Sequence, residues 1–224
     1  MNNKNNVATI GGRARFNQTY RLVMLSMFTA ITLMLAFIPN LGYITFIPAF
    51  SPTTLHIPII VCAILMGPFD GAILGLIFGL TSIIQATFTQ VNPLFSPFVP
   101  FGSYKSAIIA IVPRILIGVF AAYTFKFIQK YDKNKFIACL AAAIVGSLTN
   151  TVLVLSGMYI FFNDYVAKFA SYYKVVAKNN TDITLKILGI IFTTNGIAEA
   201  IVAIILVVPI ARTLMVIMRK TKMA

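Results

Sequence analysis

Four polar side chains fall inside long apolar stretches of this sequence, where a polar group is costly unless it has a partner or a task. They are Arg114, Asn150, Asn195 and Glu199. Counted from the ends of those stretches, each lies about 8 to 13 residues deep, at a rise of about 1.5 Å per residue. Asn195 and Glu199 are four residues apart, so they share one face of a helix. We therefore expect three helices to place these groups in a single polar layer.

Two interpretations of this layer remain open. In the first, Arg114 pairs with Glu199 and Asn150 bonds to a neighbouring helix, because a buried arginine almost requires a carboxylate. In the second, the layer is the floor of a pocket that is open to the outside and binds a small ligand. Both hold if the ion pair lies at the bottom of the pocket. Its sides and mouth would be lined by Thr54, His56, Thr81 and Gln85. The candidate substrate-binding set is Tyr43, His56, Gln85, Asn92, Ser96, Arg114, Asn150, Asn195 and Glu199.

The composition indicates that lipid is the main solvent of the elements that carry these residues. Of the 224 residues, 59% are hydrophobic and only 10% are charged, against about 25% charged residues in soluble domains. The net charge of +13 comes from lysines and arginines clustered between apolar runs, which is typical of membrane topology rather than of nucleic-acid binding. Cys62 and Cys139 fall inside apolar runs and are expected to be buried, with no disulfide, metal or cofactor.

The pattern predicts an all-α membrane protein, a bundle of six transmembrane helices with both termini in the cytoplasm. The predicted helices cover residues 22–38, 55–66, 71–88, 106–125, 136–162 and 185–217. Residues 67–70 are expected to form a tight turn, and residues 163–182 a polar loop. Residues 1–20 and 219–224 would be basic cytoplasmic tails around a membrane domain of residues 21–218.

The orientation follows from the positive-inside rule. Twelve lysines and arginines lie on one side: four precede the first helix, four lie in the basic loop at residues 126–135, and Arg212, Arg219, Lys220 and Lys222 lie at the end of the last helix or beyond it. The opposite side has five, and Arg114 is the remaining one. The long uncharged loops after the first and third helices therefore face outward, above the polar layer.

Small residues at spacings of four indicate close helix packing. Gly67, Gly71, Gly75 and Gly79 form one such ridge. Ser26 and Ala30 on the first helix form a shorter pair, which could pack internally or dock a partner helix.

Several classes of function are disfavoured by what the sequence lacks. It has no phosphate-binding P-loop, no paired membrane carboxylates and no arginine-rich voltage sensor. Glu199 is the single carboxylate predicted inside a span, and acid–base catalysis usually needs a second group, so an enzyme is not expected. A ligand-binding membrane protein without its own energy source fits best. A self-sufficient small-solute transporter or channel is the alternative.

The order of several short motifs resembles a known family. They are His56-Ile57-Pro58, then Gly67-Pro68-x-x-Gly71-Ala72-x-x-Gly75-x-x-x-Gly79-Leu80, then Pro93 to Pro97, then Pro113-Arg114-x-Leu116-x-Gly118. Their spacing is similar to that of the substrate-binding S components of energy-coupling factor (ECF) vitamin transporters. The resemblance extends from the first predicted helix to the sixth.

This resemblance implies a vitamin bound tightly in an outward pocket, beneath the loops after the first, third and fifth helices. It also implies docking to a membrane coupling protein and two cytoplasmic ATPase subunits, with Ser26 and Ala30 at the place of the family's alanine-rich docking motif. The stretches Phe95-Ser96-Pro97-Phe98 and Pro113-Arg114 are most similar to the pantothenate-specific branch. Folate, riboflavin, pyridoxine and hydroxymethylpyrimidine are the alternative ligands.

Overall fold

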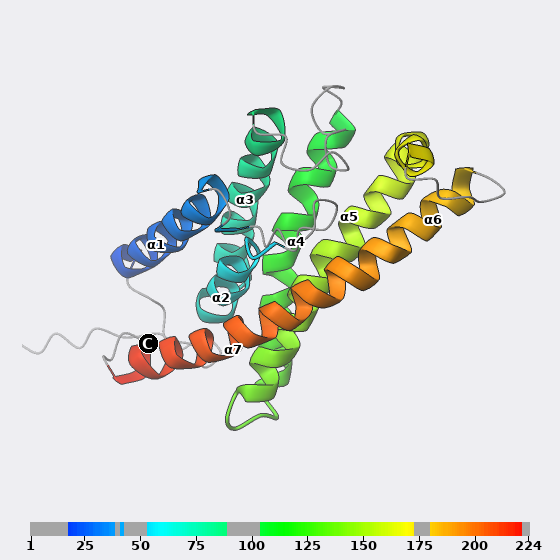
Figure 1. Cartoon of the computed structure of the whole chain (residues 1–224). Helices are drawn as coiled ribbons and strands as arrows, with labels where there is room; N and C mark the ends of the chain where they lie inside the picture. Colours follow the sequence, from blue (N-terminus) through cyan, green and yellow to red (C-terminus); the bar gives the residue numbers. More distant parts are fainter. Residues whose placement is uncertain (1–17, 39–40, 43–52, 89–103, 173–179, 221–224) are drawn as a thin grey trace, which may run out of the picture.

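The computed structural model describes residues 18–38, 41–42, 53–88, 104–172 and 180–220, and these form helices and their connections (Figure 1). One isolated bridge residue, Thr53, lies among them, and the described chain contains no strand. The elements are α1 (Gln18–Phe37), α2 (Ile57–Met66), α3 (Pro68–Phe88), α4 (Tyr104–Ile128), α5 (Phe136–Tyr172), α6 (Asn180–Ile191), a π-helical turn η2 (Phe192–Gly196) and α7 (Ile197–Lys220).

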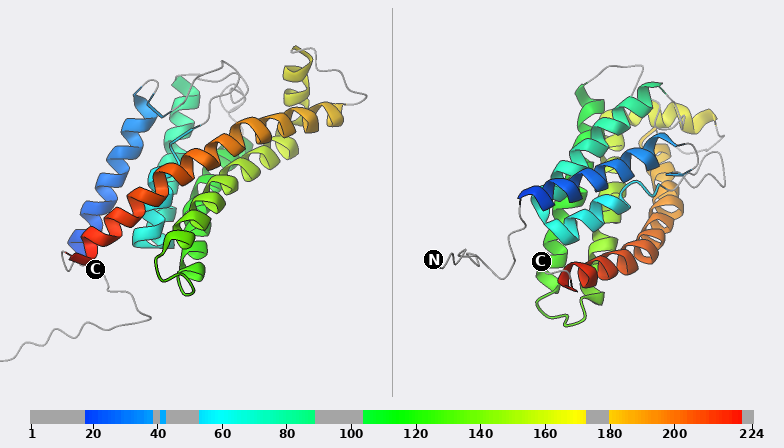
Figure 2. Two further views of the ribbon diagram at one scale, coloured as in Figure 1. Left: turned by 60° about the horizontal axis from the view of Figure 1, so that its bottom comes forward. Right: turned by 90° about the vertical axis from the view of Figure 1, so that its left-hand side faces the viewer.

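Five helical stretches of the described chain are long and apolar enough to cross a membrane. They are Gln18–Phe37, Pro68–Ala86, Tyr104–Ile128, Phe136–Asp164 and Thr181–Lys220. The last combines α6, η2 and α7 in 40 residues; it runs beside α5 and lies obliquely to α1 and α2 (Figures 1 and 2). The protein is therefore a multi-pass membrane protein, and the six-span count stays a prediction.

The helix α2 is the exception, because its 10 residues cover only about 15 Å of a hydrocarbon layer about 30 Å thick. All of its residues from Ile57 to Leu65 are buried, and it packs against α1, α3, α4, α5 and α7. Backbone that is not helical can lie at membrane depth only where protein covers it. A short α2 is therefore compatible with the bundle because other helices surround it.

The connection between α2 and α3 is tighter than expected. Gly67 has a φ of 104°, a conformation that side chains rarely adopt, and α3 begins at once with Pro68. Proline suits the first turn of a helix because its missing N–H would have no partner there. The predicted turn at residues 67–70 is thus a single glycine, and Phe69 and Asp70 already belong to α3.

The predicted glycine ridge packs α3 against α4. A Cβ atom on Gly71 would lie 3.1 Å from the Cα of Gly118, and one on Gly79 would lie 2.9 Å from the Cα of Ile111. A Cβ on Gly75 would overlap the carbonyl oxygen of Arg114. The ridge therefore brings the backbone of α3 close to the part of α4 that carries Arg114.

The predicted polar loop at residues 163–182 is wrong in part. The helix α5 continues to Tyr172 across a kink at Phe162, whose φ and ψ are −133° and 27°, and α6 begins at Asn180. The hydroxyl of Thr184 donates to the carbonyl oxygen of Asn163 at 3.3 Å, which ties α6 to the kink. Polar residues such as Asn163 weakened the helical pattern in the sequence, although the backbone stays helical around the kink.

The start of α1, the α4–α5 connection and the end of α7 lie at the same end of the molecule (Figures 1 and 2). These are the three places where the sequence clusters its lysines and arginines. Among the described residues, the arrangement therefore places Arg21, the lysines of residues 126–135 and the basic residues at the end of α7 at one end, as a single membrane orientation requires.

Candidate functional site

A layer of polar side chains separates two hydrophobic clusters of the bundle. The larger cluster contains Ile117 of α4, Ala143 of α5 and Ala203 of α7. The smaller contains Ile109 of α4, Val154 of α5 and Ile191 of α6. Along each chain segment, a predicted polar residue lies between the two clusters, and these residues are Arg114, Asn150, Asn195 and Glu199. The common layer expected from the sequence is therefore present in these helices.

Glu199 is the most extensively bonded member of the layer. Its Oε1 accepts hydrogen bonds from the backbone N–H of Thr53 at 2.9 Å and from the Thr53 hydroxyl at 3.2 Å. Its Oε2 accepts a bond from the hydroxyl of Thr151 at 3.3 Å. The carboxylate thus joins α7 to α5 and to the chain that leads into α2. Since Glu199 lies near the middle of the Thr181–Lys220 span, the chain at Thr53 reaches the same depth.

Arg114 does not form the direct ion pair with Glu199 that the first interpretation required, among the residues the structure describes. Its Nη1 donates to the carbonyl oxygen of Ile109 at 3.0 Å, and the guanidinium carbon lies 5.5 Å from the centre of the Phe78 ring. The cation therefore contributes charge to the layer from a position held by α3 and α4.

Three buried side chains at this level have polar atoms without a hydrogen-bond partner among the described residues. These atoms are both ring nitrogens of His56, the hydroxyl of Ser147 and the amide oxygen of Asn150. His56 and Ser147 are completely buried. Buried polar groups in proteins are almost always paired, so these atoms are available to a group outside the residues that the structure describes.

The packing of α2 against α5 brings these side chains to one level. A Cβ on Gly146 of α5 would lie 2.7 Å from the side chain of Ile60 of α2. His56 is four residues before Ile60, and Asn150 is four residues after Gly146, so each lies one turn from this contact. Because the carboxylate of Glu199 joins α5 and α7 one residue beyond Asn150, at Thr151, the same layer includes α7.

Asn195 lies within η2, the π-helical turn between α6 and α7, and is buried there. A π-turn is rare and is often found at functional sites. Thr193 and Thr194 bond to carbonyl oxygens of the preceding turn, at 3.0 Å and 2.7 Å to that of Ile190. These bonds satisfy backbone groups on the exposed side of the turn, while Asn195 occupies the buried side.

The remaining predicted side chains are not all part of this layer. The amide nitrogen of Gln85 donates to the carbonyl oxygen of Ala36, which ties α3 to the end of α1. The hydroxyl of Thr81 donates to the carbonyl oxygen of Ile77 at 2.8 Å, within its own helix. Tyr43, Asn92 and Ser96 lie outside the described residues.

Three residues of the layer escaped the sequence reasoning, namely Thr53, Ser147 and Thr151. Ser147 and Thr151 are four apart and flank Asn150, so they share its side of α5. That spacing was a usable signal. The contact of Thr53 with Glu199 joins residues 146 positions apart, and nothing local in the sequence indicates it.

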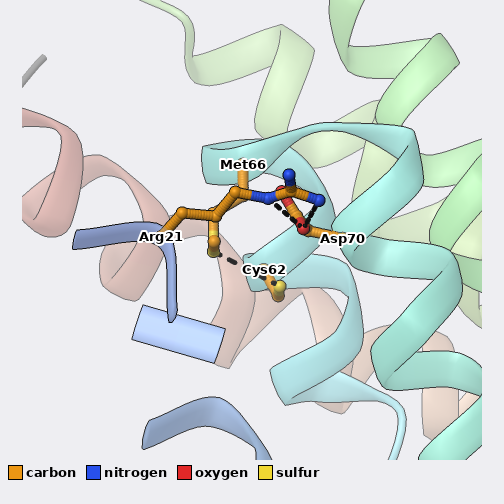
Figure 3. A network of polar contacts seen from close by, with 4 residues as sticks. All are labelled: Arg21, Cys62, Met66 and Asp70. Carbon is orange, nitrogen blue, oxygen red and sulfur yellow. Dashed lines mark hydrogen bonds and ion pairs between the residues drawn. The ribbon is translucent and has the colours of Figure 1, made fainter. Parts of the chain in front are cut away.

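The proposed docking pair lies on a helix that is only loosely covered. Ser26 and Ala30 are exposed on α1, whose buried residues are Phe28, Thr32 and Ala36. At the start of α1, Arg21 forms an ion pair with Asp70 of α3, at 2.6 Å from Nη2 to Oδ1 (Figure 3). The contact of Gln85 with Ala36 holds the other end, so α1 is attached at both ends and along one narrow face.

Comparison with known proteins gives the family. The family model of the substrate-specific component of ECF transporters matches residues 20–211. A protein of Lactococcus lactis subsp. cremoris named pantothenic acid transporter PanT is 38% identical over 171 residues, covering 73% of this chain and 78% of its own. A protein of Leuconostoc mesenteroides subsp. mesenteroides named pantothenate transporter PanT is 31% identical over 207 residues, covering 88% and 93%.

A solved structure of ThiT from Listeria monocytogenes is similar in fold, with a TM-score of 0.57 and 17% sequence identity. The match covers 87% of this chain and 98% of that one. At this identity the likeness concerns the fold alone. Together with the family model, which matches most of the chain, these relatives show that the protein belongs to the substrate-specific components of ECF transporters.

Proposed function

We propose that this chain is the pantothenate-binding subunit of an ECF transporter and that it holds its ligand in the polar layer. The observation that carries the proposal is the set of buried polar atoms on His56, Ser147 and Asn150 that have no hydrogen-bond partner among the described residues. The names of its relatives in Lactococcus and Leuconostoc support pantothenate in particular.

The chemistry of the layer suits a small anion that is rich in hydroxyl and amide groups, as pantothenate is. The fixed charge of Arg114 favours an anionic group, and charge-assisted hydrogen bonds are the strongest available. The amides of Asn150 and Asn195 can both donate and accept, and His56 offers one donor and one acceptor when neutral. Glu199, by contrast, has its carboxylate engaged by Thr53 and Thr151, which makes it a support for the site.

The proposal also covers how the ligand enters and is delivered. The proposed binding set also includes Tyr43, Asn92 and Ser96, which lie outside the described residues, and both termini face the cytoplasm across six spans. Delivery requires docking to a membrane coupling protein and two ATPase subunits, with Ser26 and Ala30 on the exposed side of α1 as the contact. The ATPase subunits would then supply the energy for release of the bound ligand.

Isothermal titration of the purified chain tests the proposal. Pantothenate, folate, riboflavin, pyridoxine and hydroxymethylpyrimidine are added separately, without ATP and without partner subunits. We expect one molecule of pantothenate to bind and the others to give no heat. Binding of a different vitamin would overturn the choice of ligand, and transport by the chain alone in liposomes would overturn the assignment as a subunit that needs an energising partner.

A further inference from the structure

The α4–α5 connection concentrates exposed lysines and exposed aromatic side chains in one short segment. Its lysines are Lys126, Lys130, Lys133 and Lys135, and all four are exposed. Between them, Phe127 is 65% exposed and Tyr131 is 80% exposed. The two rings contact each other edge to face, with centroids 6.1 Å apart. The segment thus presents positively charged side chains and aromatic rings side by side, on a surface that the rest of the described chain leaves uncovered.

No acidic side chain of this protein neutralises these lysines. The sequence has five acidic residues, and the structure describes all of them. Asp70 pairs with Arg21, Glu199 bonds to threonines inside the bundle, and Asp164 and Asp182 lie on α5 and α6 beyond the polar layer. Only Asp132 lies within the segment itself.

The carboxylate of Asp132 accepts hydrogen bonds from backbone N–H groups rather than pairing with the lysines. Its Oδ1 accepts from the N–H of Asn134 at 3.1 Å, and its Oδ2 accepts from the N–H of Ala138 at 3.0 Å. These bonds cap the start of α5, where the first N–H groups of a helix have no partner of their own. Among the described residues no ion pair joins Asp132 to a lysine, so the positive charge of the segment remains available to an external anion.

The position of the segment relative to the membrane indicates which kind of anion it binds. The connection follows directly from two membrane-spanning helices, α4 and α5, and it lies at the end of the bundle where α1 starts and α7 ends (Figures 1 and 2). Aromatic side chains are enriched at the level of lipid headgroups, and lysines close to a membrane surface are attracted to anionic lipids. An acidic soluble protein could neutralise the lysines, but it would not explain the exposed aromatic rings beside them.

We propose that the segment from Lys126 to Ile137 is a binding surface for anionic phospholipid headgroups. The lysines meet the phosphates, while Phe127, Tyr131 and Phe136 enter the interface beside them. Arg212 of α7 extends the surface, since its guanidinium carbon lies 5.5 Å from the centre of the Phe136 ring. This surface is remote from the polar layer and does not depend on which vitamin the protein binds.

The experiment uses the full chain in lipid nanodiscs made either of phosphatidylcholine or of a phosphatidylcholine and phosphatidylglycerol mixture. The measured quantity is the difference in unfolding temperature between the two lipids. We expect phosphatidylglycerol to raise the unfolding temperature of the wild type. The variant that combines Lys130→Gln with Lys133→Gln is expected to lose about half of that difference, because it removes two of the four lysines.

The control variant combines Lys105→Gln with Lys186→Gln, which removes the same charge from α4 and α6 at positions beyond the polar layer. Lys105 stacks on Phe161, so this variant can be less stable in both lipids, but its difference between lipids is expected to equal that of the wild type. Equal losses in both variants would overturn the proposal, since they would indicate a response to net charge. Retention of the full difference by the Lys130 and Lys133 variant would overturn it as well. Native mass spectrometry provides a second readout, in which that variant is expected to retain fewer phosphatidylglycerol molecules than the control.

Discussion

At the scale of single residues, Glu199 is where the sequence and the structure differ most instructively. Its burial within a span was readable from the sequence, and so was the need for a partner. The partner was not, because Thr53 and Thr151 are ordinary residues in segments far from Glu199 along the chain. Arginine was the natural choice on grounds of charge, yet three neutral donors satisfy the carboxylate. A buried charged residue is therefore easier to recognise in a sequence than the residues that bond to it.

Removing the Glu199 carboxylate should destabilise the fold more than neutralising it. In Glu199→Ala, the N–H and hydroxyl of Thr53 and the hydroxyl of Thr151 lose their acceptor, at a cost of about 1–3 kcal/mol. In Glu199→Gln, the amide oxygen still accepts from Thr53, so we expect a loss of about 1 kcal/mol or less. The free energy of unfolding in detergent checks both values. Equal destabilisation by the two variants would contradict the hydrogen-bonding role given to this side chain.

Asp132 gives the protein a pH dependence in its α4–α5 connection. Desolvation raises the pKa of this carboxyl, but bonds from the backbone N–H groups of Ala138, Ile137, Asn134 and Lys135 outweigh it, so the pKa is lowered overall. A lowered pKa in the folded state means that the stabilisation is complete above the ordinary aspartate pKa and is lost as the pH falls through the folded value. Unfolding temperatures measured from pH 7 down to pH 3 should therefore fall for the wild type. In Asp132→Ala this contribution should be missing at every pH, and an unchanged pH profile in that variant would contradict the capping role.

At the scale of elements, the long apolar helices were predictable because their length and composition leave no other solution in lipid. The α2 helix was predicted at nearly its observed length. Its complete burial was not predicted, because a short apolar run has the same composition in a buried helix as in a membrane-spanning one. The kink at Phe162 and the π-turn at Asn195 were missed for a common reason. Both are departures from regular backbone that depend on neighbouring helices, and hydropathy does not report them.

The contact of α3 with α4 can be tested by adding one methyl group. Gly75→Ala places a Cβ against the Arg114 carbonyl, which forces the two helices apart, and overpacking of this kind costs about 1–3 kcal/mol. Gly189→Ala is the matched control, because a Cβ there meets nothing within 4 Å. The control should be neutral or more stable by up to about 1 kcal/mol, since alanine favours helix. Similar free energies of unfolding for the two variants would contradict the close approach of α3 and α4.

At the scale of the whole molecule, the basic clusters lie together at one end, and the orientation across the membrane is a prediction from them. The variant Lys133→Cys tests this orientation in intact cells with a maleimide that cannot cross membranes. We expect labelling only after the membrane is permeabilised. Cys62 and Cys139 are buried, so the wild type serves as the unlabelled control. Labelling of Lys133→Cys in intact cells would contradict the cytoplasmic location of the α4–α5 connection.

Which residues contact the ligand depends on how the helices of the whole molecule pack, and the sequence alone does not show this packing. The polar layer was predicted because each of its charged and amide residues interrupts an apolar run. Which of them face a ligand depends on how α2, α5 and α7 pack, and Gln85 shows the limit, since its amide bonds to the end of α1 instead. The polar atoms of His56, Ser147 and Asn150 that lack a partner among the described residues can be recognised only once the helices are assembled.

The central claim is that this layer holds pantothenate, and mass spectrometry of small molecules retained by the purified protein tests it most directly. The wild type, purified from cells that make the vitamin and stripped of free metabolites, should release about one pantothenate per chain. Asn150→Ala is expected to retain far less, because it removes a buried amide from the layer, while the exposed Lys186→Gln should retain as much as the wild type. Equal pantothenate in all three samples, or a different vitamin in the wild type, would contradict the account.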